Sequence, residues 1–98
     1  MRGIGTTSDV AKAIQWLERA QELGVSRAWF NLGELYSNGK LVPEDFQKAA
    51  EYYRGAAERG LAAGQFRLGI LYYDGNGLTK DLTQALHWLR AAADQGDA

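Results

Sequence analysis

Apolar residues recur along the chain at helical spacing, in stretches separated by turns rich in glycine and polar residues. Between residues 27 and 38 they fall on one face of an α-helix, at Ala28, Leu32, Leu35 and Tyr36. Residues 45–59 place apolar side chains on a different face, at Phe46, Ala49, Tyr52, Tyr53, Ala56 and Ala57. The pattern therefore predicts two kinds of helix, which we name A (27–38) and B (45–59).

The same residues return every 36 positions without a gap, and self-similarity of this kind is the signature of a repeat architecture. The B helices share Asp9, Asp45 and Asp81, then Ala13, Ala49 and Ala85, then Trp16, Tyr52 and Trp88, then Ala20, Ala56 and Ala92, then Gly24, Gly60 and Gly96. The A helices share Leu32 with Leu68, Gly33 with Gly69, Leu35 with Leu71, Tyr36 with Tyr72, and Gly39 with Gly75. Further B helices are expected near 9–23 and 81–95 and a further A helix near 63–73, so the order B-A-B-A-B predicts five helices.

The shared positions also predict the helix ends and contacts. The Asp at the start of each B helix can accept hydrogen bonds from the unpaired amides there. Gly24, Gly60 and Gly96 are expected in the left-handed conformation that ends a helix. Gly33 and Gly69, with Ala20, Ala56 and Ala92, are expected to let neighbouring helices approach closely.

The combined pattern, Leu-Gly-x-Leu-Tyr-x-x-Gly followed by Asp-x-x-x-Ala, an aromatic residue, Ala-Ala and Gly, resembles the Sel1-like repeat family, a relative of the tetratricopeptide repeat. Residues 31–60 and 67–96 look like two units, and residues 11–24 like the second half of a preceding unit. The resemblance implies an all-α, right-handed α-α superhelix (solenoid) of five helices and about two and a half repeats. The expected division is a tail (1–8), a half repeat (9–24), two repeats (25–60 and 61–96) and the start of a further unit (97–98). Some family members carry a disulfide in each repeat, whereas this chain has no cysteine.

The resemblance also implies an adaptor or scaffold that binds a peptide or protein partner, rather than an enzyme, on the concave face of the A helices. By motif position the partner-binding candidates are Arg27, Phe30, Asn31, Glu34, Ser37 and Asn38 in the first A helix and Ala63, Phe66, Arg67, Ile70, Tyr73 and Asp74 in the second. Aromatic residues on an outward helix face can anchor a partner. The alternative is that these aromatics only pack against the neighbouring helix, and that the arginines are merely solvated.

The stretch LYYDGNGLTKD (71–81) raises the question of a calcium loop or a phosphate loop. If Asp74 and Asn76 were the third and fifth ligands of an EF-hand, Tyr72 would be the first and Thr83 the last, where carboxylates are needed. A phosphate loop needs Lys followed by Ser or Thr after its glycines. Because the previous repeat shares only the first glycine, as Gly39, the stretch is interpreted as a turn between helices.

The composition narrows the function further. The net charge is −1 and no basic run is present, which argues against nucleic-acid binding, including RNA reading of the pentatricopeptide type. His87 is the only histidine and is expected at the helix surface, so no metal site, cofactor or catalytic group is predicted. The three tryptophans, Trp16, Trp29 and Trp88, are expected in the core.

The ends of the array raise the question of self-association, because repeats bury their apolar faces only by stacking. Leu86, Trp88 and Leu89 would lack a following unit, so we expect either a longer array or a homo-oligomer formed through the terminal helices. A purely structural, stacking segment is the alternative function. The N-terminus has no signal-peptide core and no apolar run is long enough for a membrane span, so a cytoplasmic, reducing compartment is expected for the chain as given.

Overall fold

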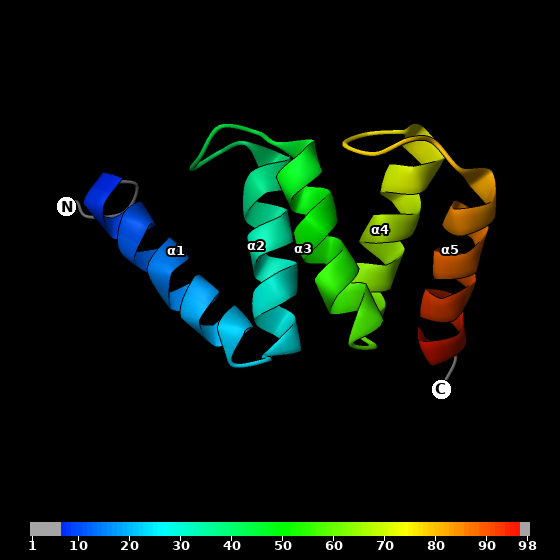
Figure 1. Ribbon diagram of the computed structural model, residues 1–98, viewed down its shortest axis with the longest axis horizontal. Helices are drawn as coiled ribbons and strands as arrows, with labels where there is room; N and C mark the ends of the chain where they lie inside the picture. The colour runs from blue at the N-terminus through cyan, green and yellow to red at the C-terminus, as the bar shows by residue number, and fades with distance from the viewer. Residues whose placement is uncertain (1–6, 97–98) are drawn as a thin grey trace.

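The chain folds into five α-helices, which the computed structural model describes over residues 7–96 (Figure 1). They are α1 (Thr7–Glu22), α2 (Ser26–Asn38), α3 (Phe46–Glu58), α4 (Ala62–Asp74) and α5 (Leu82–Gly96). Consecutive helices run in opposite directions and pack in a row. This confirms the all-α repeat fold, with α2 and α4 as the A helices. Residues 1–6, in the expected tail, and residues 97–98, the expected start of a further unit, lie outside the described residues.

The starts of two B helices are capped as the sequence predicts. The Asp45 carboxylate accepts a hydrogen bond from the Lys48 amide at 3.0 Å, and Asp81 accepts from the Gln84 amide at 3.1 Å. Such caps satisfy amides that have no partner inside the helix. Asp9 instead lies in the first turn of α1, which begins two residues earlier at Thr7.

Glycine ends both A helices, as expected. Gly39 and Gly75 have φ angles of 68° and 75°, the left-handed region that closes a helix. Each loop that follows is closed by a backbone hydrogen bond, from Asp45 to the Tyr36 carbonyl at 2.9 Å and from Asp81 to the Tyr72 carbonyl at 3.0 Å. The stretch 71–81 is therefore the end of α4 and a turn.

Glycine closes two of the three B helices. Gly24 and Gly60 both have a φ of 87° and lead directly into the next A helix. The same prediction is wrong for Gly96, which is the last residue of α5 and has no positive φ. The difference is one of context, because the backbone turns at Gly24 and Gly60 in order to start a following helix, whereas no helix follows α5 among the described residues.

The core lies between the A and B helices and depends on small residues at the contacts. Leu32, Tyr53 and Leu68 are its largest fully buried side chains. A Cβ added to Gly33 would lie 2.6 Å from the Tyr53 ring, and one added to Gly69 would lie 2.7 Å from Leu89. The expected close approach at these glycines is therefore confirmed.

The tryptophans divide between core and surface. Trp88 is half-buried against the core, and Trp29 is half-buried beneath the Arg59 guanidinium, which lies 4.3 Å from its ring. The prediction for Trp16 is wrong, since that side chain is 74% exposed. Its counterpart Tyr52 packs against the preceding A helix through Trp29 and Tyr36, and no A helix precedes α1 among the described residues.

The two contacts between successive repeats, α1 with α2 and α3 with α4, differ in how closely the helices approach. At the α3–α4 contact, Gly64 lets the helix backbones approach, and Gly77 holds its loop against the Phe46 carbonyl of α3. At the α1–α2 contact the equivalent residues are Ala28 and Leu41, whose side chains need more room. Figure 1 shows α1 leaning away from α2 towards its N-terminus, in agreement with this difference. No described helix is both long and apolar enough to cross a membrane.

Candidate functional site

An open cleft of about 350 Å³ lies between the A helices α2 and α4, with Tyr53 of α3 at its base. The cleft exists because the two A helices are neighbours on one side of the row, while the B helix between them sits behind. Its polar lining consists of Glu34, Ser37, Asn38, Tyr53, Arg67, Asp74 and Asn76, and its apolar lining of Phe46, Ile70 and Leu71.

A chain of polar contacts crosses the cleft and joins three helices. The Glu34 carboxylate accepts from Arg67 Nε at 2.7 Å, and this is an ion pair between α2 and α4. The same Glu34 oxygen accepts from the Tyr53 hydroxyl at 3.1 Å, and that hydroxyl lies 2.9 Å from Ser37 Oγ. Because each side chain is held by another, Arg67 is fixed in position although its side chain is 46% exposed.

The surroundings raise the pKa of two members of this network, Tyr53 and Arg67. Burial raises the pKa of the Tyr53 phenol from 10.0 to about 12, so this hydroxyl stays neutral at physiological pH. The hydrogen bond to Glu34 raises the pKa of the Arg67 guanidinium. Neither change produces a base or a nucleophile near neutrality.

The structure brings six of the partner-binding candidates into this cleft: Glu34, Ser37, Asn38, Arg67, Ile70 and Asp74. Arg27 and Asn31 are exposed on α2 outside the lining. Phe30 is half-buried, with its ring centroid 5.8 Å from that of Tyr53, so it packs within the repeat.

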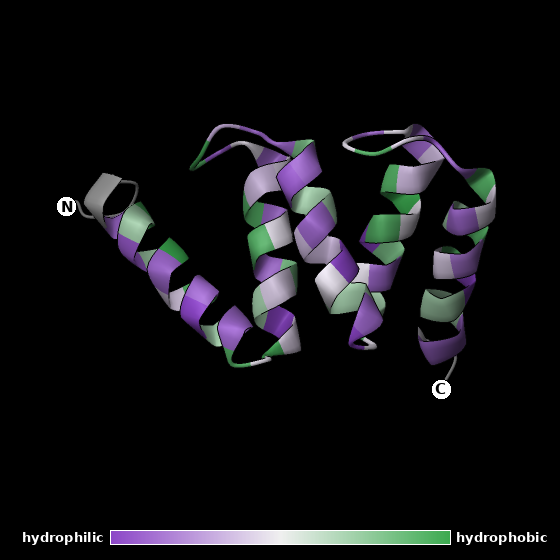
Figure 2. Cartoon of the chain, in the orientation of Figure 1, coloured by the Kyte–Doolittle hydropathy of each residue, from purple (hydrophilic) through white to green (hydrophobic). Residues whose placement is uncertain are grey.

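The remaining aromatic candidates are the ones that stay accessible. On α4, Phe66 is 46% exposed and Tyr73 is 57% exposed. Figure 2 shows several strongly apolar residues along α4. Phe66 also lines a shallow apolar groove between α4 and α5 together with Leu89 and four alanines.

Tyr53 is the site residue that the sequence pattern did not reveal. Its spacing assigns it to the apolar face of a B helix, and it is indeed buried, yet its hydroxyl reaches the cleft. A buried tyrosine hydroxyl needs a hydrogen-bond partner, and this need is the one sign in the sequence that Tyr53 contacts polar residues. The partners lie 16 and 19 residues away along the chain, so spacing alone could not name them.

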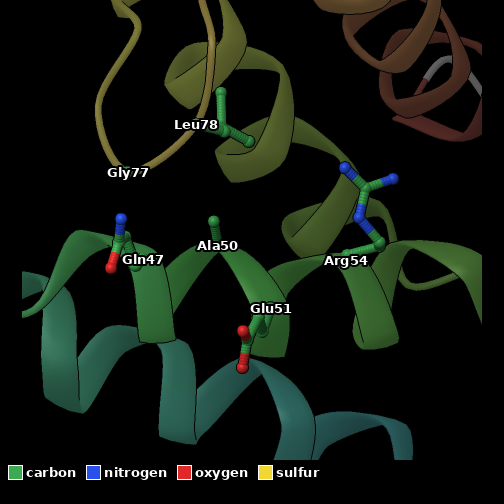
Figure 3. Close-up of a pocket in the computed structure, with 6 residues that line it drawn as sticks. All are labelled: Gln47, Ala50, Glu51, Arg54, Gly77 and Leu78. Atoms are coloured by element: carbon green, nitrogen blue, oxygen red, sulfur yellow. The ribbon is translucent and has the colours of Figure 1, made fainter.

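A second, polar hollow of about 400 Å³ lies between α3 and the loop at Gly77 and Leu78 (Figure 3). Gln47, Ala50, Glu51 and Arg54 of α3 are among its lining residues. Arg54 donates to the Tyr72 hydroxyl, and its guanidinium lies 5.6 Å from the centre of that ring. Arg54 thus fastens α3 to α4, which is a structural role. No group of three metal-binding side chains occurs among the described residues.

The profile of the Sel1 repeat family matches residues 1–25, 26–61 and 62–97, which is nearly the whole chain. Solved structures agree with this match. A protective antigen of uropathogenic Escherichia coli, c5321, which displays an SLR fold, is 42% identical with a TM-score of 0.85. A Sel1 repeat protein from Oxalobacter formigenes is 39% identical, and Helicobacter pylori cysteine rich protein B is 36% identical, each with a TM-score of 0.82.

These matches cover 93%, 87% and 88% of this chain, in that order. The chain spans only 20%, 34% and 65% of the respective structures, so it corresponds to part of each relative. A comparison with curated proteins gave no significant match. None of the matches points to a catalytic family.

Proposed function

The chain belongs to the Sel1 repeat family, and we propose that it is a binding module that holds a peptide or an extended protein segment in the cleft between α2 and α4. Repeats of this family generally mediate protein interactions, and the family match indicates no specific partner for this chain. The observation that carries the proposal is the cleft itself, in which a fixed ion pair stands beside the aliphatic Ile70 and Leu71. The exposed aromatics Phe66 and Tyr73 lie outside the cleft lining but on the same helix, α4.

This combination suits a peptide better than a small molecule. The cleft is open to solvent, whereas sites for small molecules bury most of the ligand surface. Phe66 and Tyr73 are exposed and large enough to act as anchors, and Arg67 and Asn38 can hydrogen-bond a peptide backbone. Because Glu34 and Tyr53 already hold Arg67, a partner would not have to order that long side chain.

Capture from a displayed peptide library tests the proposal. The double variant Phe66→Glu and Tyr73→Glu should lose capture by at least about tenfold, because both changes place a charge where an apolar contact forms. The matched control is Leu23→Glu with Leu41→Glu, which makes the same chemical change at two exposed apolar residues that lie on neither A helix. The proposal fails if the first variant, folded by circular dichroism, captures the same peptides as the wild-type chain.

Self-association is a second candidate function, favoured by the exposed face of α5. Leu82 and Leu86 are each 57% exposed and continue one helix face with Leu89 and Ala93. One repeat earlier the equivalent residues of α3 are Phe46, Ala50, Tyr53 and Ala57, which pack in one core with Leu68 and Leu71 of α4. The face of α5 therefore has the composition of a core surface, and a second copy of the chain could cover it.

A further inference from the structure

We infer that the cleft selects extended peptides that carry an acidic and a basic residue three positions apart. This inference rests on the proposed function and adds the chemistry of the ligand. Its basis is a separation of positive from negative charge along the A-helix face, the surface formed by the outward residues of α2 and α4. We divide this face into four levels, each made of one residue of α2 and the residue of α4 that follows it by 36 positions. The levels are Arg27 with Ala63, Asn31 with Arg67, Glu34 with Ile70, and Asn38 with Asp74.

The charge on these levels changes from positive to negative along the helices. The two levels nearest the helix N-termini carry only positive charge, from Arg27 and Arg67, and the two nearest the C-termini carry only negative charge, from Glu34 and Asp74. Both A helices run the same way in Figure 1, so the two sets do not interleave. Only Glu34 and Arg67, at the middle levels, pair with each other.

The charges of the first and last levels, Arg27 and Asp74, interact unfavourably with the helix dipole. Arg27 is the second residue of α2, where the helix end is positive, and Asp74 is the last residue of α4, where it is negative. Neither side chain has a hydrogen-bond or ion-pair partner among the described residues. A charge that opposes the local electrostatics and has no partner in the fold is expected at a functional surface.

Arg67 retains binding capacity although it is paired. Glu34 accepts from its Nε, so the two terminal nitrogens of the guanidinium remain for other acceptors, of which the Tyr53 hydroxyl is one. A carboxylate of a ligand can accept from these two nitrogens side by side. The chain of contacts from Ser37 through Tyr53 to Glu34 holds the guanidinium ready for it.

The spacing of the charges sets the spacing in the ligand. Arg67 and Asp74 are seven residues apart on α4, which corresponds to about 10 Å along the helix. A polyproline II segment advances about 9 Å in three residues and returns to the same side. A peptide with an acidic residue at one position and a basic residue three positions later therefore matches Arg67 and Asp74. Ile70 lies between these two on α4 and offers an apolar contact to the intervening residues.

Fluorescence anisotropy at about 50 mM salt, where surface charges are weakly screened, tests the inference. The probes are labelled, end-blocked peptides with the cores Glu-Pro-Pro-Lys, Glu-Pro-Pro-Glu, Lys-Pro-Pro-Lys and Gln-Pro-Pro-Gln. The mixed peptide should bind about three- to tenfold more tightly than each of the others, the effect of two partly exposed charge pairs.

The variant Asp74→Lys should transfer the preference to the peptide with two glutamates. It is expected to fold, because Asp74 has no partner and a cation suits a helix C-terminus. The control is Asp94→Lys, which changes an exposed carboxylate near the end of α5, outside the cleft, and should leave the preference unaltered. Equal affinity for the mixed and uncharged peptides, or no binding of any of the four, overturns this inference. The proposed function is lost only if the library capture also fails.

Discussion

Replacing Gly64 by alanine tests the idea that one missing side chain sets the distance between the two repeats. A Cβ at Gly64 would lie 2.6 Å from the Ala56 Cβ, 3.2 Å from the Ala56 carbonyl carbon and 3.1 Å from the Ala57 amide nitrogen. Non-bonded carbon atoms prefer about 3.5–4.0 Å. Because most of these contacts are with backbone atoms of α3, no side chain can rotate away, and α3 and α4 must separate.

The magnitude follows from two opposing effects. Adding a methyl group to a packed contact costs about 1–3 kcal/mol. Alanine in place of glycine inside a helix returns about 0.5–1 kcal/mol. The free energy of unfolding should therefore fall by about 1–2 kcal/mol, which lowers the urea midpoint by about 0.5–1 M for a domain of this size.

Urea denaturation followed by circular dichroism at 222 nm measures this change. The matched control is Gly96→Ala, because Gly96 is also helical but has no neighbour within 4 Å of an added Cβ. Its free energy of unfolding should stay within about 0.5 kcal/mol of the wild-type value. A Gly64→Ala protein as stable as the control would refute the reasoning.

The remaining predictions concern Tyr53 and α5. Because burial raises the pKa of Tyr53 from 10.0 to about 12, its contribution to stability is complete below pH 10 and is lost as the pH rises from about 10 to about 12. Urea denaturation at pH 9, 10 and 11 should show a loss that reaches about 1.4 kcal/mol at pH 11 and is absent from Tyr53→Phe, and identical pH profiles would contradict the assignment. If α5 mediates self-association, light scattering over a hundredfold dilution should show a falling mass for the wild-type chain and a constant monomer mass for Leu86→Glu. A wild-type chain that is monomeric at every concentration would rule this candidate out.

The sequence was informative about features that depend on the repeat period or on residues close along the chain. The 36-residue period placed all five helices, because each repeat must bury the same faces. Asp45, Asp81, Gly39 and Gly75 could be assigned as helix ends because their capping depends only on neighbouring backbone.

The sequence was misleading where the burial of a residue depends on the place of its helix in the row of helices. Trp16 has the repeat position of the half-buried Tyr52 and Trp88 but is exposed, because burial there requires a preceding A helix. The candidate site was predicted only in part for a similar reason. Glu34 and Arg67 were both candidates, yet their pairing across 33 residues, and the contribution of Tyr53, depend on how three helices converge.

The backbone hydrogen bonds that close the two loops have a practical consequence. The hydrogen bond between the Asp45 amide and the Tyr36 carbonyl holds the two ends of the first loop together. The helices on either side therefore stay in place whatever path the residues between them take. The second loop is further tied at Gly77, whereas the first carries Leu41, 55% exposed, at the same point. Residues 40–42 are thus a suitable place to insert an epitope tag or a fluorophore attachment site, at a distance from the ion pair that spans the cleft.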